Sequence, residues 1–365
     1  MIAKTTIKRT LLLFLMFTSI LGFSQEHHEA EKKADTEEEF DATELIMHHI
    51  SDAHEFHVAD INGESISFPL PVILWTDNGL VTFMSSEFHH DNTGEHVVEK
   101  NGMKFVRLHE EIYYANKHGG ITLNEEHHAE NRRPLNFSIT KNVFSLFLAA
   151  ALMLLIFIPT ARSYKKGNGV MPKGIGRFME PLILFVRDDI AKPNIGEKKY
   201  KAYMPYLLTV FFLIWIGNIF GLIPFFPFSG TLTNDILFTG VMAAITFLIT
   251  QFSGNKEYWG HIFWMPGIPV PMKIIMAPIE LIGIFTKPFA LMIRLFANIT
   301  AGHIIILSLF SLIFIFGTAW VSPVSVGFAL FMNVLELLVA ALQAYVFTLL
   351  SALFIGQAVA EHDHH

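Results

Sequence analysis

Ionisable and amide side chains stand within the most hydrophobic part of this chain, where helices usually carry none. An ionisable group in hydrocarbon costs about 2.5–3.5 kcal/mol on insertion scales. These groups are therefore expected to face protein or water, and they predict an ion path or a binding site. The alternative is a set of structural salt bridges between helices, and Lys287, next to Pro288, could instead extend to the membrane surface. The set is Glu280, Lys287, Arg294, Asn298, His303, Asn333, Glu336 and Gln343.

These groups differ in whether they can exchange protons. Arg294 stays protonated at any useful pH, so it cannot relay protons. A fixed cation does favour the ionised form of a nearby carboxylate. His303 and Glu336 both titrate and can carry protons. The combination indicates proton movement coupled to a carboxylate on another molecule.

Helical geometry divides the groups between two faces. At about 100° per residue, Glu280 and Asn298 each lie about 40° from Arg294, so the three share a face. His303 follows Arg294 by nine residues, which is about 180°, and points the opposite way. Glu336 and Gln343 are seven residues apart and share a face of the next helix.

The elements that must position these residues are membrane helices. The chain has 365 residues, of which 52% are hydrophobic and 16% charged, and the apolar residues collect after residue 140. The last two apolar stretches exceed one upright span, since more than 40 residues make roughly 60 Å of helix. Pro288 and Gly302 are possible breaks in the first of them. Spans are predicted at 141–160, 204–226 and 236–251, followed by the long stretches at 273–316 and 324–358.

The predicted fold is an all-α polytopic membrane protein with about five membrane helices. The last two are expected to form a hairpin that is kinked, strongly tilted or near-horizontal in the membrane. Between the third span and this hairpin, Gly and Pro in "SGNKEYWGH" and "MPGIPVP" predict no regular helix. No internal repeat is visible in the sequence.

The N-terminal part predicts export. Residues 1–24 combine a basic start with an apolar core of 13 residues, which is typical of a signal peptide, with an uncleaved anchor as the alternative. Residues 25–140 follow as an exported polar region, solvated at first and then β-prone over 57–125, which predicts a small β-rich module. The basic loop 161–203 is cytoplasmic by the positive-inside rule, so the orientation agrees with export. The C-terminal tail, 359–365, is expected in the cytoplasm of a bacterium, with the chain in its inner membrane.

Composition restricts the chemistry further. Without cysteine, disulfides and thiolate metal sites are excluded. The sequence shows no basic face with interleaved aromatic residues, so a nucleic-acid partner is not expected. It also shows no phosphate-binding loop of the type GxxxxGK[ST], so we expect neither an enzyme nor a cofactor. Residues 26–140 hold 13 of the 18 histidines, several as adjacent pairs. Such pairs leave a metal site open, but we favour a soluble, pH-sensitive segment and predict no metal.

Two motifs are specific. "PIELIGIFTKPFALMIRLFANITAGHIII" followed by "LELLVAALQAYVFTLLSALF" resembles subunit a of the F-type (F1Fo) ATP synthase of bacteria. "WIGNIFGLIP" (215–224) and "TNDILFT" (233–239) are similar to its second and third spans. The resemblance covers about 141–358. It does not include 26–140, which is a long N-terminal extension for this family.

The resemblance implies a role for each matching position. Arg294 corresponds to the arginine that faces the rotating c ring and separates two half-channels. Two departures concern the access path: many bacterial members carry Glu and His in the reverse order at 303 and 336, and many carry Asn where Leu237 stands. The resemblance implies that four residues line the proton path near this arginine: Asn298, His303, Glu336 and Gln343. It places Glu280 on the path to the cytoplasm and Asp235 at the outer mouth of the channel.

The implied function is that of a non-catalytic stator subunit of the Fo proton channel. Its implied partners are the c ring, the b-subunit peripheral stalk, the remaining F1Fo subunits, the lipid bilayer and protons. Two alternatives stay open, a self-contained proton-coupled transporter and a purely structural membrane scaffold. H⁺ is favoured over Na⁺ because His303 and Glu336 titrate, while the ring size and working direction are left open.

Overall fold

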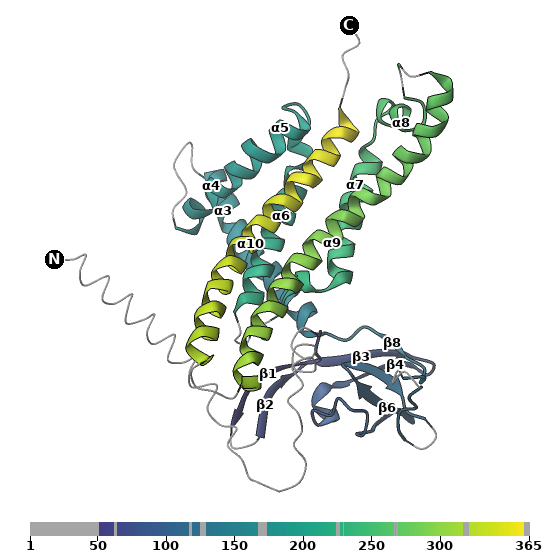
Figure 1. Cartoon of the computed structure of the whole chain (residues 1–365), viewed down its shortest axis with the longest axis vertical. Helices are drawn as coiled ribbons and strands as arrows, with labels where there is room; N and C mark the ends of the chain where they lie inside the picture. Colours follow the sequence, from purple (N-terminus) through teal and green to yellow (C-terminus); the bar gives the residue numbers. More distant parts are fainter. Residues whose placement is uncertain are drawn as a thin grey trace, which may run out of the picture.

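The computed structural model describes residues 51–61, 64–116, 119–124, 129–166, 174–223, 227–228, 230–265, 267, 269–316 and 321–360. A β-rich part precedes residue 141, and helices follow it (Figure 1). The β-rich part lies at one end of the helices, the end where α9 (Val270–Phe316) finishes and α10 (Val321–Val359) begins (Figure 1). The predicted signal peptide and most of the histidine pairs lie outside the described residues.

The β-rich part consists of antiparallel pairs in three sheets. One sheet pairs β1 with β2, a second has the order β4-β3-β8, and the third has the order β5-β6-β7. The predicted β-rich module is therefore present, and it extends to residue 136. The strands are β1 (Glu55–Ile61), β2 (Glu64–Pro69), β3 (Pro71–Thr76), β4 (Gly79–Met84), β5 (Val98–Lys100), β6 (Met103–Leu108), β7 (Glu111–Tyr114) and β8 (Leu135–Asn136), with a 3-10 turn η1 (Ser85–Phe88) after β4.

A buried ionic cluster holds the β-rich part together. The side chain of Arg107 is fully buried; its Nε donates to the Asp91 carbonyl at 2.9 Å and one terminal nitrogen donates to Glu55 at 3.2 Å. The other terminal nitrogen lies 3.7 Å from Glu110. Burial alone would raise the pKa of Glu110, but hydrogen bonds from His54 and the Arg107 charge outweigh burial, so this pKa is lowered.

Replacing Arg107 with methionine is expected to unfold the β-rich part, because it removes the buried cation that Glu55 and Glu110 both face. Breaking such a buried network costs about 3–5 kcal/mol. Limited proteolysis of the membrane-embedded chain should then cut within 51–136. The control is Arg132→Met, since Arg132 makes an exposed pair with Asp77 at 2.7 Å that contributes at most about 1 kcal/mol. Equal protease resistance of the two variants would contradict the conclusion that the ionic cluster around Arg107 stabilises the β-rich part.

Backbone hydrogen bonds attach the β-rich part to the first membrane helix. Lys141 N–H donates to the Ala53 carbonyl at 2.9 Å, and Asn142 N–H donates to the Asp52 carboxylate at 3.0 Å. Ile139 N–H donates to the Pro71 carbonyl at 3.0 Å. The segment before α3 is thus tied to β3 and to the residues before β1.

Five of the described helices are long and apolar enough to cross a membrane, as predicted. They are α3 (Lys141–Lys166), α6 (Tyr200–Leu222), α7 (Ile236–Ser253), α9 (Val270–Phe316) and α10 (Val321–Val359). The shorter elements are α4 (Ile175–Phe185), the π-helical turn η2 (Val186–Ala191), α5 (Lys192–Ile195), the 3-10 turn η3 (Leu232–Asn234) and α8 (Lys256–Phe263).

Helices α9 and α10 pack along each other as the predicted over-long hairpin (Figure 1). α9 has 47 residues, or roughly 70 Å of helix. The breaks expected at Pro288 and Gly302 are absent, because α9 runs through both positions and through Pro278. Proline removes a single hydrogen bond, and neighbouring helices can compensate for that loss. A helix of this length must then tilt to keep its apolar surface in the membrane.

One further expectation about local structure was wrong. The segment around "SGNKEYWGH" contains a regular helix, α8, because Asn255 caps its first turn by accepting from Tyr258 N–H at 3.1 Å. The basic segment 161–203, for which the sequence predicts a side of the membrane but no local structure, is largely helical over its described residues, in α4, η2 and α5. Short amphipathic helices at a membrane surface carry basic side chains without leaving the helical conformation.

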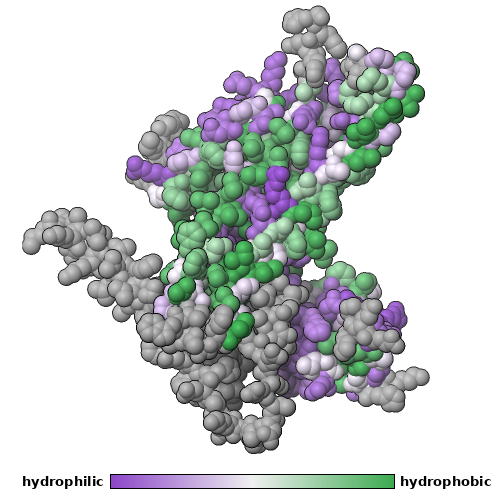
Figure 2. Space-filling view, viewed as in Figure 1, coloured by the Kyte–Doolittle hydropathy of each residue, from purple (hydrophilic) through white to green (hydrophobic). Residues whose placement is uncertain are grey.

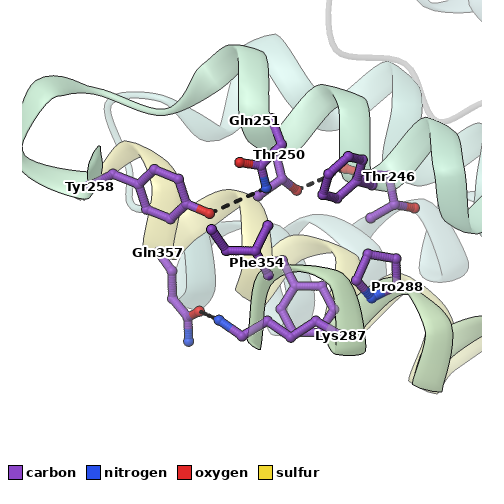
Figure 3. A pocket seen from close by; sticks show the side chains of 10 residues that line it. Thr246, Thr250, Gln251, Tyr258, Lys287, Pro288, Phe354 and Gln357 are labelled. Carbon is purple, nitrogen blue, oxygen red and sulfur yellow. Dashed lines mark hydrogen bonds between the residues drawn. The ribbon is translucent and has the colours of Figure 1, made fainter. Parts of the chain in front are cut away.

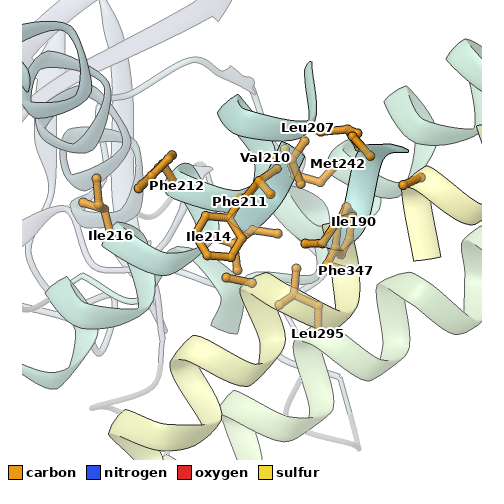
Figure 4. Close-up of a cluster of buried hydrophobic side chains, with 14 of the residues drawn as sticks. Ile190, Leu207, Val210, Phe211, Phe212, Ile214, Ile216, Met242, Leu295 and Phe347 are labelled. Atoms are coloured by element: carbon orange, nitrogen blue, oxygen red, sulfur yellow. The ribbon is translucent and has the colours of Figure 1, made fainter. Parts of the chain in front are cut away.

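The helical core lies where α6 packs against α10, α3 and η2 (Figure 4). Its buried side chains come from sequence-distant helices and fix the hairpin against α6. By contrast, α9 and α10 expose much of their apolar surface, and Figure 2 shows hydrophobic side chains along their length. That surface is suited to lipid or to another membrane subunit. The core includes Ile190, Leu207, Val210, Phe211, Phe212, Ile214, Met242, Leu295 and Phe347.

Candidate proton-translocation site

His303 of α9 and Glu336 of α10 meet between the two helices of the hairpin. His303 Nδ1 lies 2.9 Å from Glu336 Oε1, as expected if the two titratable groups form one relay. Glu336 is 4% exposed. The contact is short but falls outside hydrogen-bond geometry, and both carboxylate oxygens lack a hydrogen-bond partner among the described residues. A buried carboxylate with free acceptor capacity is well placed to take up a proton or a water molecule.

Gly302 makes this close approach possible. A Cβ atom at position 302 would lie 3.0 Å from Glu336 Oε1 and 3.3 Å from its carboxyl carbon. The absence of a side chain therefore lets the carboxylate rest against the backbone of α9, beside His303. The sequence motif "AGH" thus places a required glycine next to the histidine.

Replacing Gly302 with valine is expected to move Glu336 away from His303 and to reduce ATP-driven proton pumping several-fold. The branched side chain would occupy the position of the carboxylate, and overpacking of this kind costs about 1–3 kcal/mol. Pumping is measured in inverted membrane vesicles. Gly283→Val is the matched control on the same helix, since nothing lies within 4 Å of a Cβ there. Equal pumping by the two variants would show that the close contact between Glu336 and Gly302 has no role in pumping.

The chain before α7 connects the histidine to the end of the bundle that carries the β-rich part. Thr231 Oγ1 lies 2.9 Å from His303 Nε2, and Thr300 hydrogen-bonds Asn234. Gly221 of α6 leaves room for Thr231, because a Cβ there would clash with the threonine side chain. These contacts form a line of polar groups that leads from His303 toward Asp235.

Asp235 caps the first turn of α7, accepting from Leu237 N–H at 2.8 Å. It also interacts electrostatically with Asp52 of the β-rich part, outside the membrane helices. Burial raises the pKa of Asp52, and the Asp235 charge adds to that effect, while Thr140, Asn142 and Lys141 oppose it. The β-rich part therefore brings a second carboxyl group to this end of the polar line.

Arg294, Asn298 and Glu280 share the face of α9 predicted from helical geometry, since α9 is continuous. Arg294 and Asn298 are exposed, and Glu280 is half-buried. Among the described residues Arg294 makes no hydrogen bond or ion pair, so its charge is free to engage another molecule. Gln343 is buried on α10.

A second polar region lies at the other end of the hairpin, in a pocket between α7, α8, α9 and α10 (Figure 3). Lys287 Nζ donates to Gln357 Oε1 at 3.1 Å, and Gln251 Nε2 donates to the Tyr258 hydroxyl at 3.3 Å. Burial raises the pKa of Tyr258, and the Glu280 charge raises it further. Glu280 is thus electrostatically coupled to this pocket.

Arg294 lies between the two polar regions. It follows Lys287 by seven residues, about 10 Å of helix, and precedes His303 by nine, about 14 Å. A non-titrating cation therefore separates a titratable pair at one end from a polar pocket at the other. Sequence analysis missed Thr231, Asn234 and Gly221 of the first region and Tyr258 and Gln251 of the second. Gly221 and Asn234 lie within the motifs "WIGNIFGLIP" and "TNDILFT", but the motifs do not show which of their residues contact the site. For all five residues, the spatial neighbours reveal the role.

Comparison with known proteins gives two family matches. The model described as "ATP synthase A chain" matches residues 143–356, and the model described as "Domain of unknown function (DUF8433)" matches residues 45–137. The chain is similar to "ATP synthase subunit a" of Chloroherpeton thalassium, with 51% identity over 63% of this chain and 69% of that relative.

Two other relatives are similar over the same region. "ATP synthase subunit a 2" of Chlorobaculum tepidum is 50% identical over 63% of this chain and 66% of the relative. "ATP synthase subunit a" of an Anaeromyxobacter species is 45% identical over 62% of this chain and 55% of the relative. The family match covers more than half of the chain, and the first relative is matched over two thirds of its own length. The chain is therefore a member of the ATP synthase A chain family.

Proposed function

We propose that this chain is the stator subunit of the Fo proton channel of a bacterial ATP synthase. Members of this family are membrane-embedded, non-catalytic, proton-translocating subunits that work with the c ring and the other F1Fo subunits. The observation that carries the proposal is the position of Arg294 on the exposed face of α9, between two polar regions. Within the described part of the chain this cation has no ion-pair partner. The b-subunit peripheral stalk is a further expected partner.

The first half-channel runs from Asp235 to the His303–Glu336 pair. Thr231 and the Asn234–Thr300 contact line this route. A proton passes from the pair to a carboxylate of the c ring, which is then neutral and can enter lipid as the ring turns. Asn298 and Gln343 lie near this transfer point and keep it polar. The driving force is about 2.3 kcal/mol per charge per 100 mV, together with the pH difference.

Arg294 separates the two half-channels. Its charge favours the ionised form of a ring carboxylate that passes it, so the carboxylate gives up its proton on the far side. The same fixed charge repels a proton moving directly from one route to the other. Because arginine does not titrate, this barrier holds at every pH at which the protein is folded.

The second half-channel leaves through the pocket around Lys287, Gln251 and Tyr258, with Glu280 beside it (Figure 3). The basic segment 161–203 supports a cytoplasmic position for this end by the positive-inside rule. The end with the β-rich part is then periplasmic, and the C-terminus is cytoplasmic. The division that we propose is a signal peptide at 1–24, an exported region at 25–140, a membrane domain at 141–358 and a tail at 359–365.

A self-contained proton-coupled transporter is the alternative, since it also uses buried charges. To distinguish the two, the chain is tagged at its C-terminus and purified from membranes in mild detergent, and the preparation is reconstituted into vesicles. We expect c ring, b subunit and F1 to copurify, and ATP to drive proton uptake. Isolation of the chain by itself, with proton-coupled uptake of a solute, would overturn the proposal.

A further inference from the structure

One face of the β4-β3-β8 sheet is apolar and exposed. Trp75 lies opposite Leu80 of β4 on one side and Leu135 of β8 on the other. Phe137 continues the row by donating its N–H to the Ile73 carbonyl at 2.8 Å. The exposed fractions are 56% for Trp75 and 64% for both Leu135 and Phe137. We refer to Trp75, Leu80, Met84, Leu135 and Phe137 as the apolar sheet face.

The opposite face of the same sheet already forms the core of the β-rich part. Val72 and Leu74 of β3 and Val81 and Phe83 of β4 are buried there. Antiparallel sheets usually bury one face and present polar residues on the other. A sheet that is apolar on both faces indicates that the second face also contacts something.

The chain path puts this face next to the membrane. Phe137 stands four residues before Lys141, where the first span α3 begins, and the segment between them is bonded to β3 at Ile73 and Pro71. α3 is a peripheral span: only 17% of its apolar window is buried, and Phe147 and Leu155 are exposed. β3 and β8 lie on the side of the β-rich part that is turned toward the helices (Figure 1), and hydrophobic side chains gather along that edge (Figure 2).

We propose that the apolar sheet face rests on the lipid surface of the membrane, beside α3. Trp side chains favour the headgroup region, where the apolar ring meets lipid and the indole N–H meets water. Phe and Leu side chains beside it add apolar contact with the lipid. Asp77 follows Trp75 closely along the chain, and its exposed ion pair with Arg132 belongs to the polar rim of such a contact. Lipid contact would hold the β-rich part, and with it Asp52, over the entrance beside Asp235.

The test uses the intact complex in phospholipid vesicles. Phe137 is replaced with p-benzoylphenylalanine, a photoreactive residue of similar shape, and the vesicles are irradiated. We expect mass spectrometry of the chain to find an adduct of one phospholipid mass. The matched control is p-benzoylphenylalanine at Glu99, an exposed position of β5 away from the apolar sheet face, which should give several-fold less lipid adduct.

A companion variant makes the result specific to the face. Trp75→Glu together with Leu135→Glu should reduce the lipid adduct at position 137, while copurification of the c ring with the variant reports that assembly is intact. Crosslinks from position 137 that reach only another subunit or a second copy of this chain would overturn the proposal. So would a lipid yield no higher than that at Glu99.

Discussion

Replacing Arg294 with alanine is expected to abolish ATP-driven proton pumping while the complex stays assembled. Arg294 is exposed and makes no contact within the described chain that would support folding, so its removal should leave α9 and its packing unchanged. Loss of one preorganised charge typically reduces a rate by about 10²–10³. Pumping in inverted vesicles should therefore fall below detection.

The control for this variant is Arg177→Ala. Arg177 is also exposed, but it lies in α4, outside the candidate spans. Copurification of the ring with both variants shows that assembly is intact. Normal pumping by Arg294→Ala would show that the arginine is not part of the mechanism. It would favour the alternative that the chain is a purely structural membrane scaffold.

Exchanging His303 and Glu336 for each other is expected to preserve more pumping than changing either one by itself. The side chains lie 2.9 Å apart, so the exchange keeps one imidazole and one carboxyl group at the same place. His303→Glu alone puts two carboxyl groups together, and the repulsion between them disrupts the relay. A single change should reduce pumping by on the order of 10²-fold, in line with the usual contribution of a positioned acid or base.

The double variant His303→Glu with Glu336→His should recover a substantial part of the wild-type rate. Recovery has a physical limit, because a glutamate at 303 loses the contact between His303 Nε2 and Thr231. Gln343→Glu combined with His303→Glu serves as the unmatched control. It also carries two substitutions, but it places no imidazole opposite the new carboxyl group at 303. If the exchange is no better than the single variants, the two residues act separately.

Much of this architecture follows from patterns that any chain in a membrane must obey. The spans are predictable because about 20 apolar residues cross the hydrocarbon, and the shared face of Glu280, Arg294 and Asn298 follows from a regular helix. The meeting of His303 with Glu336 was expected from chemistry and from the family resemblance, not from spacing. Their roles in proton transfer remain predictions.

The features that the sequence did not predict depend on tertiary contacts between residues far apart along the chain. α9 continues through Pro288 because its packing neighbours tolerate a missing hydrogen bond, whereas the sequence suggested a break. α8 forms because of a single capping side chain, Asn255, within a glycine- and proline-rich segment. Thr231 reaches His303 across 72 positions, and nothing in its local sequence signals that contact.

In the proposed mechanism, Arg294 divides two proton routes that would otherwise join. The direct measurement is passive proton flux through vesicles from which F1 has been removed and in which the ring is immobilised by a cross-link to the stator. Without rotation, the wild-type complex should be proton-tight, and the Arg294→Ala complex should leak because its two routes connect. A variant that is as tight as the wild type under these conditions would contradict the claim.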